Sequence, residues 1–200
     1  MRYRSLKATS TPVVEPVTLA EAKAHRRVDT VNDDDYLVGL IRAAREYCEA
    51  YMDETLLPTQ YVMKFDTFPP ETIELPRPPM LATGTATAVT ITYTTGDTGA
   101  TATLATTEYR VDRDSVPGTI RPPYNQSWPT HLKDYNAISV TWWAGRQDIT
   151  AVSQRVKSAM LMLVGFWYEY RGAVLTGTIS KEIEFGVKAL LDSVKWGSYA

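Results

Sequence analysis

The sequence predicts an α+β fold, in which a helical bundle of about four helices carries an inserted antiparallel β-sheet or small barrel between helices two and three. Apolar residues recur at helical spacing near both ends of the chain. Between them, β-branched and aromatic residues alternate with polar ones, and prolines fill the connections. We therefore expect a flexible N-terminal arm at 1–16, a helical body at 17–58 and 148–200, and a β-rich insertion at 59–147.

The first part of the chain predicts an arm followed by two helices. Residues 1–16 are rich in Thr, Ser and Pro and show no hydrophobic period, which is typical of a segment without fixed structure. Thr18 and Glu21 have the spacing of a capping box at the start of a short helix. Asn32 or Asp33 can cap a second helix. Its apolar face consists of Tyr36, Leu37, Leu40, Ile41, Ala44, Tyr47, Cys48 and Tyr51.

The middle of the chain changes to strand and turn patterning after Pro58. Val89, Ile91 and Tyr93 alternate with threonines, which indicates a pleated strand with one buried face. The adjacent Trp142 and Trp143 must point to opposite faces of a strand, so we expect one of them in the core. Further strand candidates are 61–65, 73–75, 101–104, 109–112 and 137–143.

Two helices are expected at the C-terminal end. Residues 151–170 are apolar nearly all round, so this helix must be enclosed on several sides. A loop at 172–180 leads to a last helix at about 181–195. One face of that helix presents Ile183, Val187, Leu190, Leu191 and Val194. Together with Trp196, this is more apolar surface than a short terminal helix needs, so we expect the helix to bind a partner.

The charge balance argues against tight binding of nucleic acid. The chain has 21 basic and 23 acidic residues, a formal net charge of -2 and no run of Lys or Arg. A protein that grips phosphates needs a concentrated positive surface. The basic residues near the N-terminus are not followed by an apolar stretch, and the longest apolar run, 159–168, is about half of a bilayer span. We expect neither a signal peptide nor a membrane helix, and therefore a cytoplasmic site of synthesis.

The side chains that could carry catalysis are few and dispersed. The two histidines, His25 and His131, lie in different parts of the chain, whereas a general base needs a positioned partner. The acidic run at 33–35 suits a helix N-terminus and lacks the pattern of a calcium loop. The single cysteine, Cys48, has no partner for an intramolecular disulfide and suits apolar packing. We expect no enzyme, no cofactor and no metal.

Several local strings, in their order along the chain, resemble the head-tail connector (adaptor, or head completion) proteins of long-tailed bacteriophages and prophages. The resemblance covers about residues 17–194. Its strings are 17–23 (VTLAEAK), 33–37 (DDDYL), 43–47 (AAREY), 75–79 (LPRPP), 127–129 (SWP), 137–141 (AISVT), 167–171 (WYEYR) and 186–191 (GVKALL). No single string is diagnostic of the family by itself, but the order of the strings along the chain is diagnostic.

This resemblance implies a structural virion protein rather than an enzyme. Proteins of this family form a homo-oligomeric ring of about a dozen copies at the neck of the virion, after assembly in the host cytoplasm. The ring docks under the portal protein, continues the DNA channel and provides the docking surface for a tail-side stopper or tail terminator protein. The resemblance implies that DNA passes through without specific binding and that no membrane is involved.

Within that hypothesis, two groups of residues are candidates for function. Repulsion from an acidic channel keeps DNA phosphates from settling into contacts. The channel-lining candidates are Glu46, Glu49 and Asp53, on the polar face of the second helix. The portal-binding candidates are Ile183, Val187, Leu190, Leu191 and Trp196.

Two alternatives remain open from the sequence alone. The Thr-rich strands and the tryptophans also suit a β-sheet interaction module that binds a carbohydrate or a host surface, with Trp128 or Trp143 in contact with the ligand. An enzyme of an unrecognised kind is the second alternative, because residues distant in sequence can converge in a fold.

Overall fold

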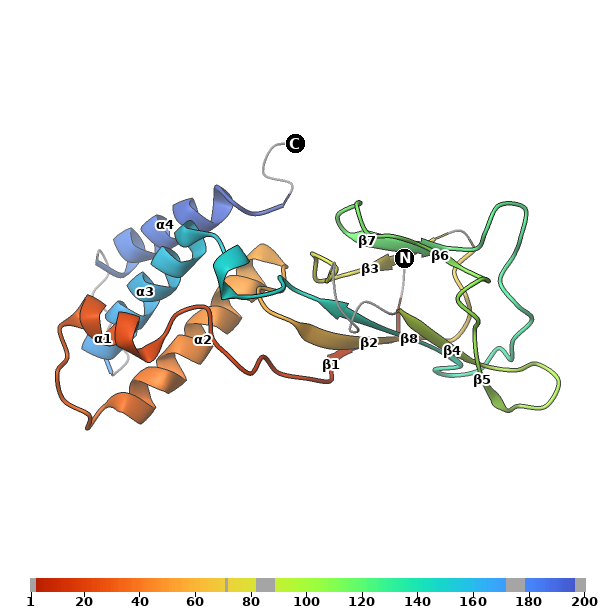
Figure 1. Ribbon diagram of the computed structural model, residues 1–200, viewed down its shortest axis with the longest axis horizontal. Helices are drawn as coiled ribbons and strands as arrows, with labels where there is room; N and C mark the ends of the chain where they lie inside the picture. Colours follow the sequence, from red (N-terminus) through yellow and green to blue (C-terminus); the bar gives the residue numbers. More distant parts are fainter. Residues whose placement is uncertain (1–2, 71, 82–88, 172–178, 197–200) are drawn as a thin grey trace. The chain divides into compact units, whose positions relative to one another are not determined.

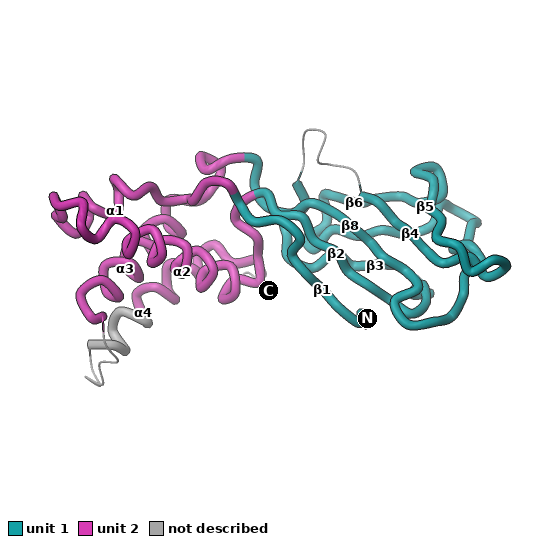
Figure 2. The backbone as a smooth tube through the Cα atoms, turned by 90° about the horizontal axis from the view of Figure 1, so that it is seen from below, with its two compact units in different colours: residues 1–12, 58–147 teal, residues 13–57, 148–200 magenta. Residues whose placement is uncertain are grey.

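The computed structural model describes residues 3–70, 72–81, 89–171 and 179–196, with side chains in the last range from residue 185 onward. The chain forms two compact units, which Figure 2 shows in separate colours. The β-rich unit comprises residues 1–12 and 58–147. The helical unit comprises residues 13–57 and 148–200. Each unit is therefore built from two separate stretches of the chain.

The helical unit is organised around one enclosed helix. Its helices are α1 (Leu19–Arg26), α2 (Asp34–Met52), α3 (Gln154–Glu169) and α4 (Ile179–Asp192), with a short 3-10 turn, η2 (Ile149–Ala151), before α3. Helix α3 packs against α1, α2 and α4 (Figure 1). Its buried positions include Val156, Met160 and Val164. The prediction that this nearly all-apolar helix is enclosed is confirmed.

The capping box at the start of α1 is present as predicted. The hydroxyl of Thr18 accepts a hydrogen bond from the Glu21 amide at 3.1 Å, and the Glu21 carboxylate accepts one from the Thr18 amide at 2.7 Å. Two amides that have no partner within the helix are thereby satisfied. The hydrogen bonds from the Thr18 backbone and side chain lower the pKa of Glu21 below its usual value.

The N-terminus of α2 differs from the capped end that the sequence predicts. Asp33 occupies the N-cap position, but its side chain makes no capping hydrogen bond. Its carboxylate instead accepts hydrogen bonds from the hydroxyl of Tyr168, in the last turn of α3, at 2.7 Å and from Arg171, just after α3, at 2.8 Å. These two bonds, the one from Tyr168 first, lower the pKa of Asp33 below its usual value. Asp33 therefore joins the start of α2 to the end of α3 instead of capping α2.

The β-rich unit contains two antiparallel sheets. The strands are β1 (Ser5–Ala8), β2 (Thr59–Phe65), β3 (Ile73–Leu75), β4 (Thr90–Thr94), β5 (Thr101–Thr103), β6 (Arg110–Asp112), β7 (Gly118–Arg121) and β8 (Ile138–Ala144). The first sheet has the order β1-β2-β8-β4-β5, and the second has the order β3-β7-β6. The predicted α+β fold, with antiparallel sheets between the second and third helices, is confirmed. Among the described residues the sheets do not close into a barrel, so that alternative is wrong.

One hydrophobic core holds the two sheets together. Alternate residues of β8 point inward, so that Ile138, Val140 and Trp142 are buried. They share a core cluster with Ile73 of β3 and Ile120 of β7, which belong to the other sheet. Trp143, on the opposite face of β8, is half-buried. The alternation expected for the tryptophan pair is therefore confirmed.

Two strands were not predicted from the sequence. Residues 1–16 were expected to form an arm without structure, but β1 pairs with the free edge of β2, and Arg4 forms an ion pair with Asp66 at 2.5 Å. Strand β7 lies between Pro117 and Pro122, in a proline-rich stretch whose pattern predicts a connection, but it pairs with both β3 and β6. Both strands are four residues long, and their local patterns are weak. Pairing with distant strands stabilises them.

Gly39 offers a test of the α2 assignment. It lies inside α2 at an exposed position, and a Cβ atom added there would meet no atom within 4 Å. Because glycine in a helix interior is less stable than alanine by roughly 0.5–1 kcal/mol, Gly39→Ala should raise the free energy of unfolding by about that amount. Urea denaturation followed by circular dichroism measures the change. A loss of stability would contradict the placement of Gly39 in an open, regular helix.

Candidate assembly surfaces

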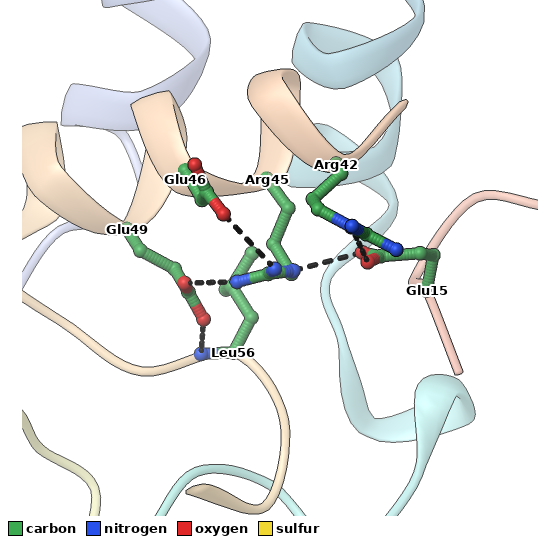
Figure 3. Close-up of polar contacts among 6 residues, drawn as sticks. All are labelled: Glu15, Arg42, Arg45, Glu46, Glu49 and Leu56. Atoms are coloured by element: carbon green, nitrogen blue, oxygen red, sulfur yellow. Dashed lines mark hydrogen bonds and ion pairs between the residues drawn. The ribbon is translucent and has the colours of Figure 1, made fainter. Parts of the chain in front are cut away.

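A buried arginine organises the polar side of α2 (Figure 3). Arg45 is only 6% exposed. Its Nε atom donates to Glu15 at 2.8 Å, and its Nη1 atom donates to Glu49 at 2.6 Å. Glu46 lies 3.6 Å from the same guanidinium group, and Arg42 approaches Glu15 at 4.0 Å. A guanidinium group buried to this degree needs such partners, because an unpaired buried charge is strongly destabilising.

Glu49 connects this network to the loop after α2. One carboxylate oxygen accepts the hydrogen bond from Arg45, and the other accepts one from the Leu56 amide at 2.9 Å (Figure 3). Burial raises the pKa of Glu49, although the Leu56 amide and Arg45 act in the opposite direction. The pKa of Arg45 is also raised, since the charges of Glu49 and Glu15 outweigh the opposing effect of burial. The network thus holds residues 15 and 56 against α2.

The three acidic channel-lining candidates differ in exposure. The Glu46 side chain is 63% exposed, whereas that of Glu49 is 14% exposed and lies within the Arg45 network. Asp53 is exposed at the C-cap of α2, in a left-handed conformation with φ of 55°. Glu46 and Asp53 therefore present carboxylates at the surface, and Glu49 acts mainly inside the fold. Whether any of them lines a channel stays a prediction.

The portal-binding candidates also differ in their exposure. Val187 and Leu191 are fully buried in the helical core, and Leu190 is half-buried against it. Trp196 is 54% exposed, while its backbone amide donates to Glu54 at 3.1 Å. Ile183 lies in α4, but its side chain falls outside the described residues. Much of the apolar stripe on α4 is thus used for packing within the subunit, and portal binding stays a prediction.

Phe185 was missed by the sequence reasoning. It lies on α4 and is 76% exposed. The available signal was a large aromatic ring away from the stripe that contains Val187 and Leu191. Among the described residues of the C-terminal region, Phe185 and Trp196 are the two large aromatic side chains that are exposed. We call these two residues, one on α4 and one shortly after its end, the α4 aromatic pair.

Helix α4 is held firmly behind this pair. Val187 and Leu191 pack in the core, and the Tyr51 hydroxyl donates to the Asp192 carboxylate at 2.8 Å. The hydrogen bond with Asp192 raises the pKa of Tyr51. Phe185 is therefore presented by a helix that packs on α2 and α3, and Trp196 follows the end of that helix.

The two histidines and the cysteine, which are the side chains considered for catalysis, lie in different parts of the fold. The His131 ring shares one hydrogen bond with the Thr67 hydroxyl at 2.9 Å and another with the Pro129 carbonyl at 3.1 Å. His25 belongs to the helical unit and is exposed. Burial raises the pKa of the Cys48 thiol to about 12, so this thiol stays protonated and unreactive at neutral pH.

Among the described residues, the His, Cys, Asp and Glu side chains form no group of three or more that could hold a metal ion. None of the helices that the structure describes is long and apolar enough to cross a bilayer.

The tryptophans considered for ligand contact are largely engaged in packing. Trp142 is fully buried and stacks on Tyr61, with ring centroids 5.7 Å apart. Trp128 stacks on Phe68 at 4.7 Å with nearly parallel rings. One face of the Trp128 ring is thus covered, which weakens the case for a carbohydrate platform.

Part of this architecture matches the model of a known protein family. Residues 16–93 match the model of the family described as phage gp6-like head-tail connector protein. The matched region includes α1, α2 with Arg45 and Glu49, and the strands β2 and β3. No curated protein sequence gives a significant match.

Solved structures share the fold over nearly the whole chain. A chain from the neck of an empty GTA particle, computed with C6 symmetry, has a TM-score of 0.75 at 19% identity, with 94% of both chains covered. A chain from the virion of a native gene transfer agent (GTA) particle has a TM-score of 0.71 at 18% identity, with 94% of this chain and 93% of that chain covered. A chain from the neck of a native GTA particle, computed with C12 symmetry, has a TM-score of 0.67 at 20% identity, with the same coverage. At these identities the likeness establishes the fold.

Two alanine variants in α4 test its division into an inner and an outer face. Leu191→Ala should lower the free energy of unfolding by about 2–5 kcal/mol, because it opens a cavity in the core. Phe185→Ala should change it by less than about 0.5 kcal/mol, because the ring is exposed. Chemical denaturation of both variants gives the comparison. Equal losses would contradict the packing described for α4.

Proposed function

We propose, from the premise that this chain is a head-tail connector protein of the phage gp6-like family, that its copies form a closed ring in the neck of a phage-like particle. The family is one of structural connectors, so the expectation of a non-enzymatic protein is confirmed. The observation that carries the proposal is the family match over α1 and α2. The fold likeness to chains from neck structures supports it.

A ring requires each copy to present two different surfaces that fit each other. Repeated head-to-tail contacts produce a closed ring when the rotation between neighbouring copies is a whole fraction of a full turn. The related neck structures were computed with C6 and C12 symmetry, which favours a ring of about a dozen copies for this chain as well. A sixfold or twelvefold axis places every exposed side chain at many equivalent positions around the ring. A contact or charge that is weak in one copy is therefore repeated by every copy.

The α4 aromatic pair is our candidate for contact with the portal protein. Phe185 and Trp196 are exposed, and α4 is anchored behind them. Aromatic side chains are enriched at protein interfaces because a rigid ring buries much surface at little entropic cost. Val187 and Leu191 support the helix from the core, and Ile183 and Leu190 remain candidates for flanking contacts. The opposite side of the ring would receive a tail-side stopper or terminator protein.

The exposed acidic residues of α2 suit the wall of a DNA channel. Glu46 and Asp53 present carboxylates, and a ring repeats each of them once per copy. Repulsion from such a belt would keep phosphates from binding and let DNA pass. Glu49 contributes by holding Arg45 and the following loop in place.

Docking on portal-bearing capsids tests the aromatic pair. The double variant Phe185→Ser, Trp196→Ser should bind at least tenfold more weakly than the unmodified protein, because both anchors are lost. The matched control is Val13→Ser, Val31→Ser, which removes two apolar side chains that are 100% and 73% exposed in the same unit. Co-sedimentation with the capsids measures binding, and circular dichroism confirms folding. Undiminished docking of the folded aromatic variant would sink the assignment.

A further inference from the structure

The three-stranded sheet presents two arginines side by side on its outer face. Strands β6 and β7 pair antiparallel, and Arg110 lies directly opposite Arg121 in their register. The next pair, Val111 and Ile120, points to the other face, where Ile120 is fully buried in the core. Because side chains alternate along a strand, both guanidinium groups lie on the face away from the core.

This arrangement is unfavourable within the subunit. Like charges directly opposite each other in an antiparallel pair destabilise the sheet. Across the described residues, the side chains of Arg110 and Arg121 have no ion-pair or hydrogen-bond partner. Other exposed arginines of this chain do find acids, as Arg4 does with Asp66 and Arg171 does with Asp33. The paired arginines therefore contribute nothing to the fold that would explain their position.

A hollow of about 610 Å³ lies at the same place. Its lining includes Arg110, Arg121, Thr119 and Pro122, together with the ring of Tyr124, which is 92% exposed. Asp112 also lines it, but its Oδ1 atom accepts hydrogen bonds from the amides of Asp114 at 3.0 Å and Ser115 at 3.2 Å. That oxygen fixes the turn after β6. The hollow thus combines two cations without partners, a hydroxyl group and an exposed aromatic ring.

We propose that this hollow binds the carboxylate side chains of an acidic segment of a partner protein. Each guanidinium group offers a planar fork of donors that matches a carboxylate, and two forks side by side suit two neighbouring acidic residues. Tyr124 and Pro122 supply apolar contact for the peptide between them. The inference concerns the β-rich unit alone, so it stands or falls separately from the docking of α4.

The same features favour a protein segment over DNA. Binding to a phosphate backbone draws on many cations spread along a groove, whereas this site is a compact hollow with two. It also contains the carboxylate of Asp112, and the whole chain carries a net charge of -2. A short acidic peptide fits a site of this size and composition better than a duplex does.

Binding of a fluorescein-labelled peptide of ten glutamates tests the proposal. The full chain is titrated into the peptide and into a labelled DNA duplex at fixed low salt, and fluorescence anisotropy is recorded. The test variant is Arg110→Gln, Arg121→Gln. The control is Lys64→Gln, Lys133→Gln, which makes the same change in net charge at exposed positions of the same unit. Arg110→Lys, Arg121→Lys keeps both charges but removes the forks.

The proposal expects the glutamine variant to bind the peptide at least tenfold more weakly, with the control within about twofold of the unmodified protein. The lysine variant should fall between them, because a point charge replaces a bidentate donor. Circular dichroism should show the sheets intact in each case. Absence of peptide binding, equal losses in test and control variants, or tighter binding of the duplex that depends on the same arginines would each overturn it.

Discussion

The pairing of β2 with β8 is the constraint on which the rest of the structure depends. The two strands align residue by residue from Thr59 with Ala144 to Phe65 with Ile138. This antiparallel ladder brings the beginning and the end of the insertion side by side. The two halves of the helical unit, which are separated by about ninety residues of sequence, can therefore fold around one core.

The helical core that results leaves a defined set of side chains for assembly. Helix α3 buries its apolar surface against three other helices, and α4 adds Val187 and Leu191 to the same core. The charged groups also divide into those that stabilise the fold and those that are exposed. Glu15, Arg45 and Glu49 hold segments of the fold together, whereas Glu46 remains largely exposed. In a ring, only exposed residues such as Glu46 would contact a neighbouring copy, the portal protein or DNA.

Local patterns in the sequence predicted much of the fold and less of its surfaces. The helices and most strands followed from the spacing of apolar residues, and the Thr18 capping box followed from residue types three positions apart. Strands β1 and β7 could not be predicted, because each is short and depends on a partner distant in the chain. The link from Asp33 to Tyr168 and Arg171 was missed for the same reason.

The candidate sites show this limit most clearly. The apolar stripe on α4 was visible in the sequence, but whether it faces the core or a partner depends on the packing of α2 and α3. The exposed Phe185 lay outside that stripe. The opposition of Arg110 and Arg121 depends on strand register, which a sequence pattern does not give. Sequence reasoning therefore found the elements that carry function, and the structure was needed to tell which of their faces are exposed.

The central claim, that the chain is a ring subunit of a particle neck, is tested most directly by imaging. Purified protein would be mixed with portal-bearing capsids, and the portal vertex would be reconstructed by electron microscopy without imposed symmetry. We expect a closed ring of identical subunits at that vertex, with a central channel wide enough for duplex DNA. A protein that stays monomeric and never joins the particle would contradict it.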